Sequence, residues 1–166
     1  MPFIPQGSDF AFDSGAVALR HIRGVPAPAP AIVSLMSDVG GLPGSTLETF
    51  NVTSRPFSWT GGMVEFTSVS HPVLQQGTQY WLVVQAVNET AQAMSWELNT
   101  IGDSGTIGFR NGSTDFEWST QTSPRSAYQL SGTPLPEPAA LASVVLCFVV
   151  IARRFHYGTQ EKDSWA

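Results

Sequence analysis

The chain has 166 residues, with 13 Asp and Glu against 8 Lys and Arg, so its formal net charge at pH 7 is −5. This acidic balance, without any cluster of Lys and Arg, argues against nucleic acid as a partner, because phosphates demand clustered cations. The only cysteine, Cys147, excludes an intramolecular disulfide. The length allows one domain of ordinary size.

Residues 1–131 predict an all-β fold, an antiparallel β-sandwich of jelly-roll type. About nine short segments are alternating or rich in β-branched and aromatic residues, turns containing Gly and Pro separate them, and no helical pattern occurs before Ala139. The predicted strands cover residues 10–23, 31–37, 46–53, the two arms of 57–69, 78–87, 92–100, 105–110, 116–120 and 127–131.

Four local expectations follow from these patterns. Gly15 allows a kink or bulge that divides 10–23 into two strand pieces. Residues 38–45 (DVGGLPGS) are expected to form a turn-rich loop, and Gly61-Gly62 a two-residue hairpin turn. The apolar centre of 78–87 predicts a central strand buried on both faces, so at least one of Tyr80 and Trp81 belongs to the core.

The C-terminal region contains an uncharged run at 139–152 (AALASVVLCFVVIA), which predicts a hydrophobic helix in a membrane. As a helix it would be roughly 21 Å long, whereas a hydrocarbon core is about 30 Å thick and usually takes about 20 apolar residues. Arg153 and Arg154 end the run and would orient the helix with its C-terminal end in the cytoplasm, so the β domain would lie on the other side of the membrane. We therefore expect a proline-rich linker at 132–138, a helix with its stop at 139–154 and a polar tail at 155–166.

This region resembles the PEP-CTERM sorting segment, which consists of a Pro-Glu-Pro motif, a short hydrophobic helix and a basic cluster. The matching residues are Pro136, Glu137, Pro138, the run 139–152, Arg153 and Arg154. The resemblance implies export in a Gram-negative bacterium, an inner-membrane anchor before processing by an exosortase, and then a place at the cell surface or outside the cell. The exopolysaccharide that such bacteria make is a further candidate partner. Here FHYGTQEKDSWA follows the arginines, whereas the family usually ends close to them.

A second resemblance covers residues 31–131. The stretches SLMSDVGGLPGSTLETF and LQQGTQYWLVV are similar to choice-of-anchor domains of type R. This similarity implies an exported β-sandwich without established catalysis. The opening MPFIPQGSDF has no basic n-region or apolar h-region, so we expect that the N-terminus with its export signal is missing from this chain.

No catalytic or cofactor site is predicted. His21, His71 and His156 lack zinc-ligand spacing. Asp38 could ligate calcium, but it is the only carboxylate of its loop, so a role in the turn is favoured. A glycosidase pair of Asp115 and Glu117 is disfavoured, because residues two apart on a strand usually form a solvated face.

Two alternatives to an exported, non-enzymatic surface protein stay open. The first is a lectin-like module that binds carbohydrate by stacking, with Trp59 and Trp118 as the ligand platform, while Trp96 is assigned to the core beside Met94 and Leu98. The second is a soluble cytosolic β protein, in which 139–152 would be a core helix. Deleting residues 136–166 would damage folding only in the cytosolic case.

Overall fold

The computed structural model describes residues 1–21, 31–52, 61–86, 94–110 and 117–136. Over these ranges the chain is all β and its strand pairs are antiparallel, as predicted, and no helix occurs there. The strands are β1 (Pro2–Phe3), β2 (Phe10–His21), β3 (Ala31–Val39), β4 (Leu42–Val52), β5 (Gly62–Thr67), β6 (Val73–Leu74), β7 (Tyr80–Ala86), β8 (Met94–Trp96), β9 (Ser104–Phe109), β10 (Ser119–Pro124) and β11 (Tyr128–Pro134).

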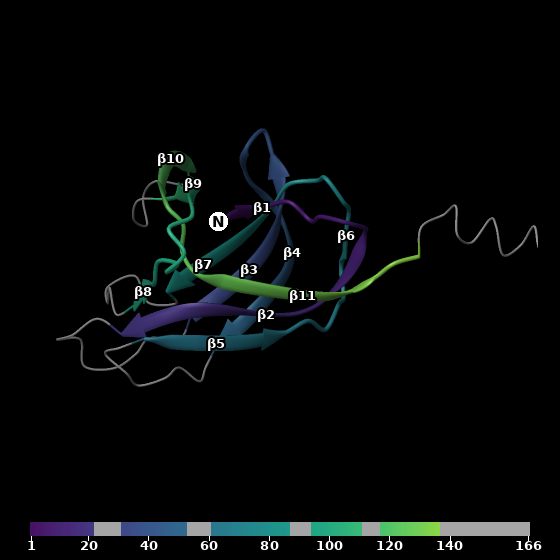
Figure 1. Cartoon of the computed structure of the whole chain (residues 1–166), viewed down its shortest axis with the longest axis horizontal. Coiled ribbons are helices and arrows are strands. Elements are labelled where there is room, and N and C mark those ends of the chain that lie inside the picture. The colour runs from purple at the N-terminus through teal and green to yellow at the C-terminus, as the bar shows by residue number, and fades with distance from the viewer. Residues whose placement is uncertain (22–30, 53–60, 87–93, 111–116, 137–166) are drawn as a thin grey trace, which may run out of the picture.

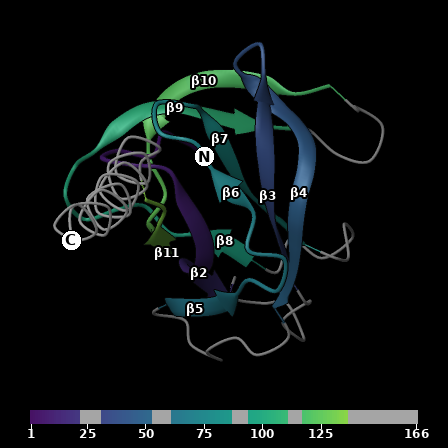
Figure 2. The same cartoon turned by 90° about the vertical axis from the view of Figure 1, so that its right-hand side faces the viewer.

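Two sheets form the body of the domain (Figures 1 and 2). One has the strand order β1-β7-β3-β4. The other has the order β11-β2-β5, and β6 and β8 also pair with β2. A separate two-stranded sheet, β10-β9, lies beside the first one.

The core lies between the two larger sheets and takes alternate residues from each strand. On β3 the inward residues Ala31, Val33 and Leu35 are at most 1% exposed, while the residues between them are half-buried. The inward side chains of β2 and β5 pack opposite them. Three phenylalanine rings form the centre of the core. The ring centroids of these three residues lie 4.7 to 6.4 Å apart: Phe12, Phe50 and Phe66.

Strand β2 runs unbroken from Phe10 to His21, and its irregularity lies at Asp13 rather than at Gly15. Ser131 of β11 pairs with Ser14, but the next residue, Gly132, pairs with Phe12, so Asp13 is the extra residue of a bulge. The bulge reverses which residues face inward, because side chains alternate along a strand. Gly15 serves another purpose: a Cβ there would lie 2.5 Å from the Phe66 ring.

The expected loop at 38–45 is instead a tight hairpin, which corrects the prediction. Val39 pairs with Leu42, and only Gly40 and Gly41 form the turn, with φ of +63° and +82°. Two left-handed residues in a row form the turn whose twist suits a hairpin, and Gly accepts this conformation without a steric penalty. Strand β4 therefore begins at Leu42, and two register shifts between β3 and β4 absorb the remaining residues of the segment.

Strand β7 is buried on both faces at its start, as predicted. Tyr80 and Leu82 face the core, while Trp81 faces the other way and is nevertheless 0% exposed. The β9-β10 pair covers it: a Cβ on Gly108 of β9 would lie 2.8 Å from the Trp81 ring. The β9-β10 sheet therefore makes a second, small apolar contact on the face of β7 that points away from the core.

Other boundaries differ from the predictions. Strands β1 and β6 have two residues each and were not predicted. Strand β10 continues through the expected Ser123-Pro124 turn, because all six of its residues pair with β9. Strand β11 continues past Ser131 to Pro134. Leu98, expected on an apolar face with Trp96, is 55% exposed, whereas Trp96 packs against the core.

Candidate functional site

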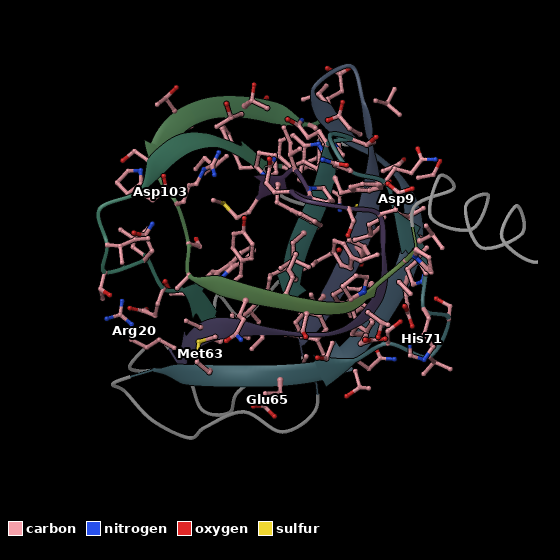
Figure 3. All side chains as sticks on the ribbon, turned by 45° about the vertical axis from the view of Figure 1, so that its right-hand side comes forward. Asp9, Arg20, Met63, Glu65, His71 and Asp103 are labelled. Atoms are coloured by element: carbon pink, nitrogen blue, oxygen red, sulfur yellow. The ribbon has the colours of Figure 1, made fainter. Side chains whose placement is uncertain are left out.

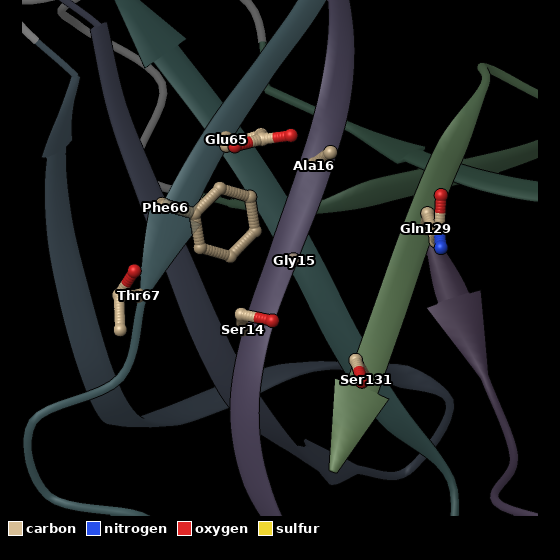
Figure 4. A pocket seen from close by; sticks show the side chains of 8 residues that line it. All are labelled: Ser14, Gly15, Ala16, Glu65, Phe66, Thr67, Gln129 and Ser131. Carbon is tan, nitrogen blue, oxygen red and sulfur yellow. The ribbon is translucent and has the colours of Figure 1, made fainter.

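A hollow of about 280 Å³ lies on the outer face of the β11-β2-β5 sheet (Figure 4). The strand register explains its shape. Gln129, Ala16 and Glu65 form one row across the three strands. Two residues along, a second row of hydroxyl-bearing residues crosses the same face, so the hollow has polar walls on β5 and β11: Ser131, Ser14 and Thr67.

The floor of the hollow consists of β2 itself. Ala16 has only a methyl group on this face and is 8% exposed, so the central strand lies lower than its polar neighbours. Gly15 and Phe66 also border the hollow, but their side-chain positions face the core, where the Phe66 ring occupies the space that a Cβ on Gly15 would need. We call this feature, lined by residues 14–16, 65–67, 129 and 131, the β2 groove.

A polar cluster around the bulge at Asp13 lies next to Ser14, just beyond the residues that line the β2 groove. Asp13 Oδ2 accepts a hydrogen bond from Thr133 Oγ1 at 2.7 Å, and Asp13 Oδ1 lies 3.1 Å from His71 Nδ1. The same Nδ1 lies 3.2 Å from the carbonyl oxygen of Phe12. Since both oxygens are acceptors, Nδ1 carries the hydrogen, and Nε2 of a neutral His71 is left as an acceptor.

His71 also has a left-handed backbone, with φ of +46°, which is uncommon outside glycine. Figure 3 shows it at the far end of the sheet from Met63 of β5, with Glu65 between them. An Asp–His pair of this kind orients a base in some hydrolases. Among the residues that the structure describes, however, no Ser, Thr or Cys side chain is hydrogen-bonded to Nε2, so the pair lacks a nucleophile there.

Trp118 lies just before β10 and is half-buried. The guanidinium carbon of Arg110 is 5.5 Å from the centre of its ring, within the range of a cation–π contact. Arg110 therefore occupies part of the surface that a sugar ring would need. Trp118 is next to the β9-β10 sheet and does not line the β2 groove, and Trp59 lies outside the described residues.

Two carboxylates that could have been ligand-binding are used to hold loops. Asp38 Oδ2 accepts the Gly41 amide at 3.0 Å, and Oδ1 accepts Trp81 Nε1 and Gln79 Nε2, each at 2.6 Å. Burial alone would raise the pKa of Asp38, but these hydrogen bonds outweigh it and hold the pKa below its usual value. The expected role of Asp38 in its turn is confirmed.

Glu48 of β4 holds the segment after β5 in the same way. Its carboxylate accepts Ser68 Oγ at 2.6 Å and the amides of Val69 and Ser70 at 2.7 and 3.1 Å. Burial would raise the pKa of Glu48, but these donors lower it on balance. The carboxylates of Asp38 and Glu48 thus have structural roles, because each accepts several hydrogen bonds from nearby segments.

The described residues contain no group of three His, Cys, Asp or Glu side chains placed to hold a metal ion. They also contain no helix with the length and apolar character needed to span a bilayer. Of the predicted sorting residues, only Pro136 falls within the described part of the chain, where it is exposed. Glu137, Pro138, the run 139–152, Arg153 and Arg154 lie outside it, as do Asp115, Cys147 and His156.

No family model, curated protein or solved structure matches this chain significantly. The two resemblances noted in the sequence therefore remain hypotheses, and the β2 groove is characterised by its own geometry.

Sequence reasoning missed the β2 groove because it searched for aromatic and charged residues. The walls of the groove consist of polar side chains from three strands that are far apart in the chain: Ser14, Glu65, Thr67, Gln129 and Ser131. One signal was present: each of these strands alternates polar and core residues, so each has a polar outer face. Which polar faces adjoin depends on the strand order, and that order was not predicted.

Proposed function

We propose that this chain is an exported, non-enzymatic β-sandwich protein, which a C-terminal PEP-type segment sorts to the membrane and an exosortase processes. The proposal includes a jelly-roll arrangement and a hydrophobic helix at 139–152. The crossings of the chain between the two sheets, after β1, β2, β4, β6 and β7, support the jelly-roll arrangement. The C-terminal segment would decide between anchoring and release.

One observation carries the proposal: the last strand of the described part of the chain ends just before the motif begins. Strand β11 ends at Pro134, and the Leu135 amide donates to the Asp9 carbonyl oxygen at 2.8 Å. The next residue, Pro136, is exposed. All residues of the main core cluster lie between Phe12 and Leu82 in the sequence, and Leu130 packs against this cluster. A processing enzyme could therefore reach the motif without unfolding the domain.

The test expresses the full chain behind a functional signal peptide in hosts with and without an exosortase, followed by fractionation and mass spectrometry of the C-terminus. We expect a product ending near residues 136–138 only in the host with the enzyme. A variant with Glu137→Ala should lose this product, while Glu117→Ala, in the exposed segment before β10, should keep it. An intact C-terminus in both hosts would contradict processing, and an intact chain confined to the soluble fraction would contradict the membrane segment.

A deletion separates this proposal from a cytosolic β protein. We expect that a chain ending at Leu135 keeps its cooperative unfolding transition and its midpoint within error, because the described core draws nothing from beyond Leu130. If residues 136–166 supplied a core helix, the truncated chain would lose stability by several kcal/mol, as expected when a large apolar contact is removed. Urea unfolding followed by circular dichroism distinguishes the two results.

A further inference from the structure

We propose that the β2 groove binds a short neutral glycan through hydrogen bonds from the outer face of the β11-β2-β5 sheet. The first argument is the chemistry of its walls. Five polar side chains line it, and none of them is hydrogen-bonded to another residue that the structure describes: Ser14, Glu65, Thr67, Gln129 and Ser131. Hydroxyl and amide groups both donate and accept hydrogen bonds, which matches the hydroxyl groups of a sugar.

The charge of the β2 groove selects against anionic ligands. Glu65 is the only charged residue among those that line it, and no Lys or Arg is present. The Asp13 carboxylate, next to Ser14 in the chain, adds further negative charge nearby. A phosphate or a uronic acid would therefore meet repulsion without a compensating cation. A neutral ligand avoids this cost, and the Glu65 carboxylate can accept hydrogen bonds from two of its hydroxyl groups.

The shape of the β2 groove suits a chain of sugar rings. Its walls stand on β5 and β11, which are separated by two strand spacings, or roughly 9.6 Å. Its floor is β2, where the Ala16 methyl group provides a small apolar surface for the C–H face of a sugar ring. The volume of about 280 Å³ is at the lower end of ligand sites. A short segment of a polysaccharide is therefore favoured over a large compact ligand.

The binding should be weak, because no wide aromatic platform is present. We expect a Kd on the order of 1 mM for a tetrasaccharide. Side chains on a paired sheet are held more firmly than those on loops, so the groove should change little when a ligand binds. The site lies within residues 14–131, and its function does not depend on processing at the C-terminus.

The test is a titration of the full ¹⁵N-labelled chain with cellotetraose and with maltotetraose, followed by NMR chemical shifts. We expect saturable shifts at residues 14–16, 65–67 and 129–131 with at least one of the two sugars. Ala16→Leu, which fills the floor, should weaken binding by at least about tenfold, and Gln129→Ala by about threefold to tenfold, the range for a lost hydrogen bond. The matched control is Thr49→Leu, an exposed position on β4, which should bind as the parent does.

Several results would overturn the proposal. One is the absence of saturable shifts with both sugars. Another is binding that Ala16→Leu leaves intact while the shifts cluster at Trp118, because the aromatic platform would then be the sugar site. A third is equal or stronger binding of tetragalacturonate, an acidic tetrasaccharide, since the charge of the groove selects against it. Far-UV circular dichroism of each variant checks that its loss does not arise from unfolding.

Discussion

Replacing Asp38 by alanine should destabilise the protein far more than its place near a hairpin tip indicates. Trp81 is 0% exposed, and its indole Nε1 donates to Asp38 Oδ1 at 2.6 Å. Without the carboxylate, this buried donor has lost its acceptor, and the Gly41 amide and Gln79 side chain lose theirs too. The variant therefore removes the carboxylate that links the β3-β4 turn to Trp81 of β7 and to Gln79 just before it.

The size of the effect follows from these contacts. A buried donor left without a partner costs about 1–3 kcal/mol, and each lost hydrogen bond to an exposed group adds about 0.5–1.5 kcal/mol. Because the three bonds share one carboxylate, their energies do not simply add, and we expect a total of about 2–4 kcal/mol. With a urea m-value of roughly 1.5 kcal/mol/M, the unfolding midpoint should fall by roughly 2 M.

Urea unfolding followed by far-UV circular dichroism measures this change, with two comparisons. Asp103→Ala is the matched control, because its carboxylate makes only a 3.6 Å ion pair with Arg125, and such pairs contribute at most about 1 kcal/mol. In a Trp81→Phe background, which has no indole N–H, the Asp38→Ala change should cost about 1–2 kcal/mol less. Equal costs in both backgrounds, or an Asp38→Ala loss below about 0.5 kcal/mol, would refute the assigned role of this hydrogen bond.

The effect of Asp38→Ala should also depend on pH. The pKa of Asp38 is lower in the folded state than in the unfolded chain. Its stabilisation is therefore fully present above the unfolded value of about 3.9 and is lost as the pH falls through the folded pKa. The difference between the parent and the variant should be constant from about pH 5 to 8 and shrink below about pH 4.

A further prediction concerns a buried contact. Gly15→Ala should cost about 1–3 kcal/mol of unfolding free energy, because its Cβ would lie 2.5 Å from the Phe66 ring, and Phe66→Leu should recover part of that loss in the double variant.

The sequence predicts long strands well where their apolar residues alternate. In β2 the apolar residues change from Phe10 and Phe12 to Val17 and Leu19, so the inward side changes between them and a bulge is required. Its position at Asp13 rather than Gly15 could not be predicted, because it depends on pairing with β11, more than a hundred residues away. Strands β1 and β6 were not predicted for a similar reason. Each has only two residues, too few to show a periodic pattern, and each forms through pairing with a distant strand.

The candidate site was less predictable than the fold. Trp118 was chosen because an aromatic residue on a polar segment is conspicuous in sequence, but its contact with Arg110 depends on the β9-β10 pairing. The β2 groove depends on two features that no single segment contains, the absence of side-chain bulk along β2 and the identity of its two neighbours. Both follow from strand order, which local patterns do not determine.

The irregular pairing of β3 and β4 has a consequence for how copies of this protein behave together. Among the described strands, β4 has a partner on one side only, so its eleven residues present an open edge. A long, regular edge invites pairing with another chain and, by repetition, fibre growth. The two register shifts against β3 interrupt the regular spacing of backbone donors and acceptors, so a second copy cannot align along the full strand. The irregular edge thus works against sheet-to-sheet pairing between copies of this protein.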